Sequence, residues 1–234
     1  MSRARPRFSR EEMLAGARAG LPVLVGLVPF GLVCGIVAQG HGLTLGEATL
    51  MSATVYAGSA QLLALGPWGT PAPILAATVA AFAVNLRLAL MGPVLSPWLD
   101  RLRGWRLWGS LFLMADQNWA MSVTRMQSGR GDAGYLFGAG LAMWAAWVAT
   151  TAAGHMLGAV VQPPPGHPLF FTALAVFVAM LASMWRGRAD LLPWVVAAGV
   201  SAGLARLLPG TSWYIVGGAL AGCAAGAWRD RARG

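Results

Sequence analysis

Long apolar runs, separated by short polar or turn-forming stretches, make up most of this chain. Eight such runs can be traced, at residues 20–39, 47–66, 72–95, 107–123, 134–161, 168–185, 190–208 and 212–228. A helical span of a membrane needs about 20 mostly apolar residues. The ten-residue alternation typical of barrel strands is missing. The pattern therefore predicts an all-α protein, a polytopic integral membrane helical bundle.

The composition agrees with this prediction. Apolar residues form 57% of the chain and charged residues 11%, whereas soluble domains carry about 25% charged residues. We expect a single transmembrane domain over residues 20–228. An arginine-rich cytoplasmic segment over residues 1–19 would precede it, and a cytoplasmic tail over residues 229–234 would follow it.

The arginines indicate how the helices are oriented. The 17 basic residues are all arginine and lie in short clusters rather than on one face, so no nucleic-acid partner is expected. If all eight runs crossed, Arg101, Arg103 and Arg106 would lie outside, against the positive-inside tendency. If 47–66 and 107–123 are re-entrant or broken, six full spans remain and fifteen arginines lie on the cytoplasmic side. Both termini are cytoplasmic in either topology, and we favour the second.

The two segments expected to be re-entrant are rich in polar and small residues. Tyr56, Ser59 and Gln61 lie in 47–66, and Asp116 lies in 107–123. Such residues at membrane depth are typical of helices broken beside a cavity, as in many secondary transporters. The hydroxyl and amide groups are therefore candidates to line a site. For each of them alone, an interhelical hydrogen bond is the more common explanation, and that alternative stays open.

Two charged residues lie deep in apolar runs. Arg87, with Asn85 beside it, lies about 12 Å inside the run 72–95 at the rise of a helix. Asp116 is similarly central in 107–123. A charge at this depth costs several kcal/mol unless a partner neutralises it. The two residues could pair with each other, or contact a substrate or coupling ion, and these interpretations are compatible.

Other residues have simpler explanations. Pro22 and Pro29 predict kinks in the first span, each of which would free a backbone carbonyl. His155 is expected to be buried and hydrogen-bonded rather than a proton relay. Cys34 and Cys223 are expected to be small buried residues rather than a disulfide or metal ligands.

Glycines spaced by four residues predict close helix packing. These are Gly31/Gly35, Gly154/Gly158, Gly199/Gly203 and Gly218/Gly222/Gly226. Tryptophans near the ends of the runs, among them Trp105 and Trp108, predict interfacial anchors.

Motifs for catalysis are missing from the sequence. It has no Gly-x-x-x-x-Gly-Lys-Ser/Thr loop and no lysine, so the chain is not expected to hydrolyse nucleotide by itself. It has no His-Glu-x-x-His motif and no paired aspartates, so we expect no catalytic residue, no metal site and no cofactor, and hence not an enzyme. The classes that remain are a secondary transporter, an ion or small-solute channel, and a permease subunit served by a separate ATPase.

Several motifs occur in an order that resembles the AzlC family of bacterial inner-membrane proteins. They are Pro22, Pro29-Phe30-Gly31, residues 51–61 with Ala57-Gly58-Ser59-Ala60-Gln61, Asn85-Leu86-Arg87, and Ala115-Asp116-Gln117-Asn118-Trp119-Ala120. The motifs cover roughly residues 14–125, and beyond them the resemblance continues only as hydropathy. Where the family has Thr-Asp-Glu, this chain has Ala115-Asp116-Gln117, so a second carboxylate is lost.

The resemblance implies a secondary transporter that exports leucine, isoleucine or valine, with methionine a further candidate. It also implies a small, separately encoded membrane partner of the AzlD type. Arg87 and Asp116 would then hold the charged ends of the amino acid, and Tyr56, Ser59, Gln61 and Asn85 would shape the site. Proton coupling through Asp116 and a higher oligomer are further hypotheses.

Overall fold

The structure, a computed structural model, describes residues 8–65, 68, 74–160, 178, 182, 185, 187–208 and 213–231. Every regular element among these residues is helical, which confirms the all-α class. The chain forms two compact units, Met1–Leu62 with Leu86–Ala173 and Leu63–Asn85 with Leu174–Gly234. Each unit is described by itself. The predicted run 168–185 lies almost wholly outside the described residues.

The first unit begins with a long helix in three parts. These are α1 (Arg10–Gly20), the 3-10 turn η1 (Leu21–Val23) and α2 (Leu24–Gly40). Ser9 starts α1, because its Oγ accepts the N–H of Glu12 at 3.2 Å. Pro22 lies in the 3-10 turn, whereas α2 continues through Pro29. The chain is therefore helical from residue 10, ten residues before the apolar run begins.

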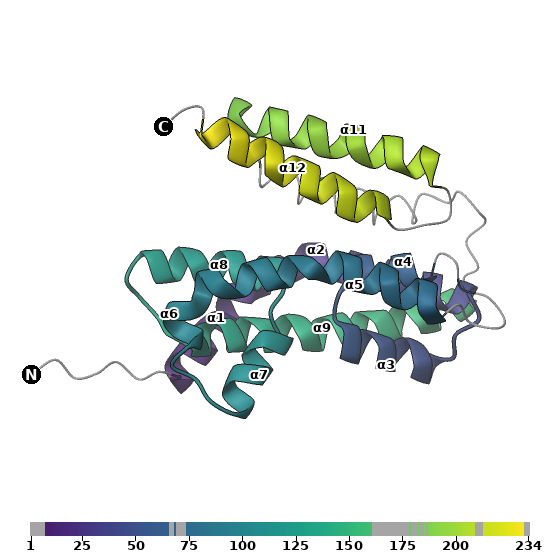
Figure 1. Ribbon diagram of the computed structural model, residues 1–234. Helices are drawn as coiled ribbons and strands as arrows, with labels where there is room; N and C mark the ends of the chain where they lie inside the picture. The colour runs from purple at the N-terminus through teal and green to yellow at the C-terminus, as the bar shows by residue number, and fades with distance from the viewer. Residues whose placement is uncertain are drawn as a thin grey trace, which may run out of the picture. The chain divides into compact units, whose positions relative to one another are not determined.

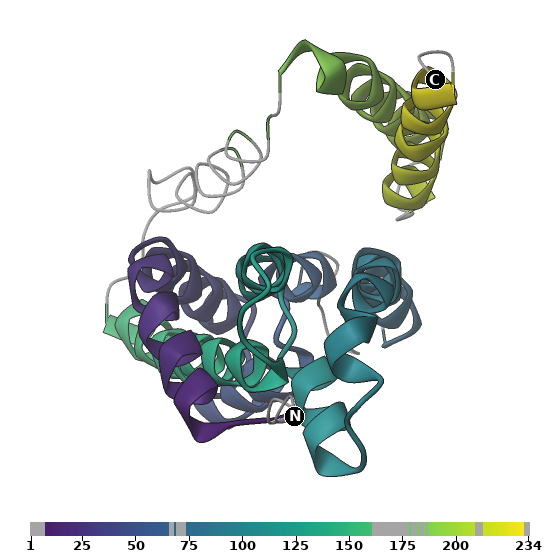
Figure 2. The ribbon, with the colours of Figure 1, turned by 90° about the vertical axis from the view of Figure 1, so that its left-hand side faces the viewer.

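Helices α1 and α2 pack in parallel on α9 (Ala133–Val160), as Figures 1 and 2 show. Gly16 of α1 lies against the backbone of Tyr135, and Gly35 of α2 lies against the backbone of Thr151. The contacts advance along both helices in the same direction, so the helices are parallel. Both the Arg10–Gly40 helix and α9 are long and apolar enough to cross a membrane. The predicted close packing is confirmed at Gly31, Gly35, Gly154 and Gly158.

The segment 47–66 is divided into α3 (Leu45–Val55) and α4 (Gly58–Leu65). Thr44 and Glu47 cap the start of α3, where the Glu47 carboxylate accepts the N–H of Thr44 at 2.8 Å. After α3, Tyr56 has φ 45° and ψ 42°, a left-handed conformation that is uncommon outside glycine. We call residues 56–57 the first break, and it confirms the predicted interruption.

The segment 107–123 is divided as well. Helix α5 (Ile74–Met91) leads through η2 (Gly92–Leu95) and α6 (Ser96–Leu99) to α7 (Trp105–Phe112), and α8 (Asp116–Gln127) follows. We call residues 113–115, between α7 and α8, the second break. Both ends of this segment lie near the start of α9: Trp105 packs on Phe137, with ring centroids 5.9 Å apart, and Arg125 lies over the ring of Tyr135.

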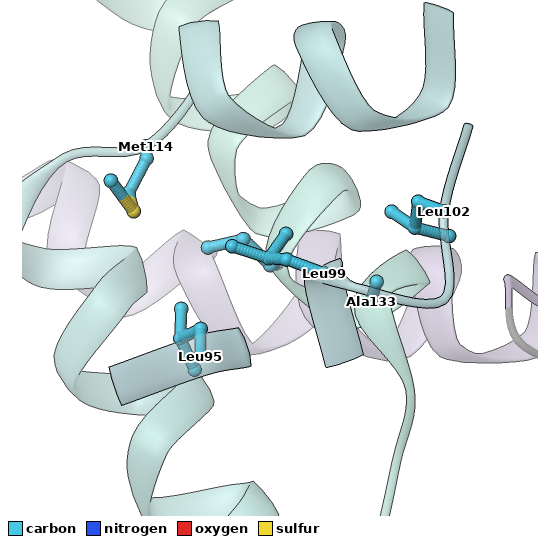
Figure 3. Packing of buried hydrophobic residues seen from close by; sticks show 6 residues of the cluster. Leu95, Leu99, Leu102, Met114 and Ala133 are labelled. Carbon is cyan, nitrogen blue, oxygen red and sulfur yellow. The ribbon is translucent and has the colours of Figure 1, made fainter. Parts of the chain in front are cut away.

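A cluster of buried apolar side chains fixes the second break to the start of α9. Figure 3 shows Leu95 from η2, Leu99 from α6, Leu102, Met114 from the break and Ala133 from α9 packed together. Burying a leucine or methionine side chain stabilises a fold by about 1.5–3 kcal/mol. The position of the second break relative to α9 is therefore set by packing.

The second unit contains the hairpin of α11 (Leu191–Leu207) and α12 (Trp213–Arg231), preceded by η3 (Arg188–Asp190). Gly218 lies against Ser201 and Gly222 against Ala197, so the two helices are antiparallel. The Oγ of Ser201 also donates to the carbonyl of Tyr214 at 3.0 Å.

Two predictions are not borne out among the described residues of the second unit. A Cβ at Gly199 or Gly203 would meet no described atom within 4 Å, so the predicted close packing is not seen there. Both lie on the side of α11 opposite Ser201, which faces α12. Cys34 is buried in α2 as expected, but Cys223 is exposed on α12, next to the packed Gly222 rather than on the packed face.

Candidate functional site

One face of α9 meets both helix breaks. Gly140, Trp144 and Trp147 follow one another by four and three residues, so they lie on the same side of the helix. Trp147 contacts Gly58, directly after the first break, and Gly140 contacts Leu113 of the second break. Seven residues of helix separate these two contacts by roughly 10 Å.

Gln61 connects the two helices of the first break with α9. Its Nε2 donates to the Oγ of Ser52 at 2.8 Å, and its Oε1 accepts the indole N–H of Trp147 at 3.0 Å. Ser52 lies one turn before the end of α3, and Gln61 lies in the first turn of α4. Gln61 is only 2% exposed, so losing these bonds would leave buried polar groups unpaired.

Gly58, the first residue of α4, lies between two aromatic rings. Phe30 and Trp147 meet edge to face, with ring centroids 5.3 Å apart. A Cβ at Gly58 would lie 2.6 Å from the Trp147 ring and 2.7 Å from the Phe30 ring. A side chain here would therefore push the start of α4 away from α9.

Tyr56 and Ser59 lie at the first break and are both half-buried. The hydroxyl of Tyr56 is buried and makes no hydrogen bond with any residue that the structure describes. A left-handed backbone at a residue other than glycine costs about 1–2 kcal/mol. Strain together with an unsatisfied buried polar group is characteristic of functional sites. Ser59 stands in the first turn of α4, where backbone N–H groups have no partner within the helix.

Asn118 organises the second break. Its Oδ1 accepts the N–H of Ala115 at 2.7 Å, and its Nδ2 donates to the carbonyl of Leu113 at 2.7 Å. The residue is fully buried. A Cβ at Gly140 would lie 2.6 Å from the Asn118 amide nitrogen. The glycine at this position therefore allows the second break to pack closely against α9.

Asp116 is the first residue of α8 and is half-buried. A carboxylate in the first turn of a helix interacts favourably with the helix dipole. Three residues later, the indole N–H of Trp119 donates to the carbonyl of Met91 at 2.9 Å, which joins α8 to the end of α5.

Arg87 and Asn85 lie on α5. Arg87 precedes Met91 by one turn in the first unit, and its side chain is outside the described residues. Asn85 is the last residue of the segment Leu63–Asn85, which belongs to the second unit. It is half-buried, and its Oδ1 has no hydrogen-bond partner among the described residues.

The structure thus brings Tyr56, Ser59 and Gln61 together at the first break and places Asp116 beside the second. Neither Pro22 nor Pro29 lies at a break. His155 is part-buried, and its Nε2 donates to the carbonyl of Leu43 at 2.7 Å. A carbonyl can only accept, so this confirms the expected hydrogen-bonded histidine.

Sequence reasoning missed Asn118 and Trp147 as organising residues. Asn118 stands three residues after Ala115, which is the spacing of a residue that caps a helix start. Trp147 stands in the middle of an apolar run rather than at its end, and a buried indole N–H usually finds a hydrogen-bond partner. Both signals are present in the sequence, but neither identifies the residues that Asn118 and Trp147 contact.

Comparison with known proteins identifies a family and a relative of this chain. Residues 22–161 match the family described as AzlC protein, a range that includes both breaks and α9. An archaeal relative from Archaeoglobus fulgidus, described as an uncharacterized membrane protein, is 27% identical over 209 residues, which cover 88% of this chain and 90% of the relative. No solved structure matches. The AzlC family is a family of transporters, associated with branched-chain amino-acid transport, and not of enzymes. This chain belongs to the AzlC family.

Proposed function

We propose that this chain is the large subunit of a secondary transporter that exports branched-chain amino acids across the bacterial inner membrane. Its substrates are leucine, isoleucine and valine, with methionine a further candidate. The observation that carries the proposal is the meeting of two broken helices on one face of α9. Breaks at membrane depth offer unpaired N–H and C=O groups to a polar solute. The substrate class is supported by the family.

The two breaks offer complementary groups to a zwitterion. The first turn of α4 presents backbone N–H groups, the Ser59 hydroxyl and the positive end of a helix, which suit a carboxylate. Asp116 at the second break suits an ammonium group. The roughly 10 Å between the breaks along α9 fits a small solute rather than a macromolecule. Tyr56 and Gln61 shape this site, and Gln61 does so by holding the first break. Asn85, two residues before Arg87 on α5, stays a further candidate for substrate binding.

Arg87 is proposed to act together with Asp116. The hydrogen bond from Trp119 to Met91 joins α8 to α5. Arg87 lies one turn before Met91 on α5, and Asp116 lies three residues before Trp119 on α8. Arg87 and Asp116 therefore lie on the same side of this hydrogen bond. This supports a similar depth for the two backbone positions. Arg87 would neutralise Asp116 between transport events and, as the alternative to the first turn of α4, bind the substrate carboxylate during one. Protonation of Asp116 would remove the charge that holds the ammonium, which makes it the candidate for proton coupling.

The proposed topology has six full spans, two re-entrant segments and cytoplasmic termini. The cytoplasmic end is where α9 begins: Glu12 and Arg125 form an ion pair there at 2.8 Å, and Asp132 accepts the N–H of Ser9 at 3.0 Å. The second broken segment both begins and ends at this end of α9, as a re-entrant segment would. The first approaches from the opposite end, since His155 near the end of α9 binds Leu43 just before α3.

The proposal includes a small membrane partner of the AzlD type and leaves room for a higher oligomer. Its test is efflux of radiolabelled leucine, valine and methionine from preloaded cells that express the chain with and without the partner. We expect saturable efflux that is lost in Arg87→Gln and in Asp116→Asn at matched membrane abundance. Efflux equal to that of cells without the protein would refute the amino-acid assignment. Flux that does not saturate would indicate a channel, and flux that follows cellular ATP rather than the proton gradient would indicate a separate ATPase.

A further inference from the structure

Helix α7 has an exposed aromatic face. Trp105, Trp108 and Phe112 are three and four residues apart, so they share one side of the helix. They are 64%, 69% and 47% exposed. The opposite side packs into the protein, with Ser110 fully buried and Leu107 and Leu111 against the cluster of Figure 3.

The axis of α7 is steeply inclined to α9. Trp105 and Gly109, one turn apart on α7, both contact Phe137, and Leu113 just after the helix contacts Gly140. Eight residues of α7 extend about 12 Å, while the contacts advance by only three residues, or about 4.5 Å, along α9. Figure 1 shows this inclination. If α9 spans the membrane, the axis of α7 lies closer to the membrane plane than to the membrane normal, near the level at which α9 begins.

Three exposed arginines lie at the start of α7, namely Arg101, Arg103 and Arg106. The Arg106 guanidinium lies over the rings of Phe8 and Trp105, at 5.4 and 5.7 Å from their centroids. Arg103 donates to the carbonyls of Asp100 and Leu102 at 3.1 and 3.0 Å. None of the three forms an ion pair with a described residue, so their charges are available to an anion.

We infer that α7 is an interfacial helix that binds anionic phospholipid of the cytoplasmic leaflet. The aromatic face lies at the boundary between headgroups and acyl chains, where tryptophan is favoured. The arginines contact lipid phosphate, and the attraction to an anionic surface amounts to about fivefold in affinity for each arginine. The lipid site lies on the face of α7 that points away from the protein, before the second break begins, and does not depend on what the protein transports.

The first test measures the lipid preference of the purified full-length chain. Phosphatidylglycerol is added in a background of phosphatidylcholine, and native mass spectrometry counts the bound lipids. We expect the preference for phosphatidylglycerol to fall about a hundredfold in Arg101→Gln/Arg103→Gln/Arg106→Gln. The control, Arg188→Gln/Arg206→Gln/Arg231→Gln, removes the same charge from three other exposed positions. An equal loss in the control, or no loss in the first variant, would overturn the inference.

The second test measures the depth of the aromatic face. A nitroxide is attached at Trp108→Cys in a Cys34→Ala/Cys223→Ala chain in nanodiscs of the same two lipids. We expect this label to collide with oxygen and to be shielded from a water-soluble nickel complex. A label at Gln127→Cys, an exposed position at the end of α8, provides the aqueous reference. Nickel accessibility at 108 equal to that at 127 would place α7 in water and refute the interfacial assignment.

Discussion

Asn118 contacts the Leu136 carbonyl of α9 at 3.4 Å. It also satisfies two backbone groups that the second break leaves without helical partners, the N–H of Ala115 and the carbonyl of Leu113. Replacement by leucine keeps the volume but leaves these groups buried and unpaired. Each such group costs about 1–3 kcal/mol. The side chain therefore serves the fold of the break rather than the substrate.

We expect Asn118→Leu to lower the midpoint of thermal unfolding in detergent clearly, and to lower transport with it. The matched control is Gln127→Leu, an amide on the exposed end of the same helix, which should leave the midpoint almost unchanged. Equal midpoints for the two variants would show that Asn118 does not hold the break.

Tyr56 should behave in the opposite way. Its hydroxyl has no hydrogen-bond partner among the described residues, so Tyr56→Phe removes no bond that the structure shows. We expect the unfolding midpoint to stay the same or rise slightly, while the KM for leucine efflux increases several-fold if the hydroxyl contacts substrate. Unchanged transport kinetics would remove Tyr56 from the proposed site.

At the scale of helices, close approach depends on where glycines stand. A Cβ at Gly35 would collide with the backbone of α9, including the Thr151 carbonyl, whereas a Cβ at Gly26 of the same helix meets no described atom within 4 Å. We expect Gly35→Ala to cost about 1–3 kcal/mol through overpacking. Gly26→Ala should be neutral or stabilise by up to about 1 kcal/mol through helix propensity.

Chemical or thermal unfolding of the two alanine variants side by side provides the comparison. Because the substitution and the helix are the same, the difference reports only the contact with α9. If Gly26→Ala destabilised the protein as much as Gly35→Ala, the parallel packing of α2 on α9 would be wrong.

The interruption of helices could be predicted from sequence, because it depends on local composition. Polar and small residues around Tyr56 and Asp116 predicted both breaks, and four-residue glycine spacing predicted the packing of Gly31 and Gly35. The same spacing at Gly199 and Gly203 meets no described neighbour within 4 Å, and spacing alone does not say which face of a helix meets a neighbour. The joining of both breaks by α9 could not be predicted, because it depends on tertiary contacts between residues far apart in sequence, 86 positions for Gln61 and Trp147 and 18 positions for Asn118 and Leu136.

At the scale of the first unit, two broken segments meet a long helix from opposite ends. Trp105 and Arg125 keep both ends of the second segment at the start of α9, and His155 keeps the beginning of the first near its end. If α9 spans the membrane, the first break lies near its middle, at Trp147, and the second lies nearer its start, at Gly140, and the two are approached from opposite sides. This arrangement suits alternating access, in which a central site opens to one side at a time.

The central claim is that substrate occupies the region between the breaks. Ser59→Cys in a Cys34→Ala/Cys223→Ala chain places one thiol at the first break, and Thr54→Cys places the control thiol on the exposed side of α3. The measurement is the rate of maleimide labelling in membranes with and without leucine. The account predicts that leucine slows labelling at position 59 and not at 54, while lysine slows neither. Labelling at 59 that is unaffected by leucine, in membranes that still export it, would contradict the account.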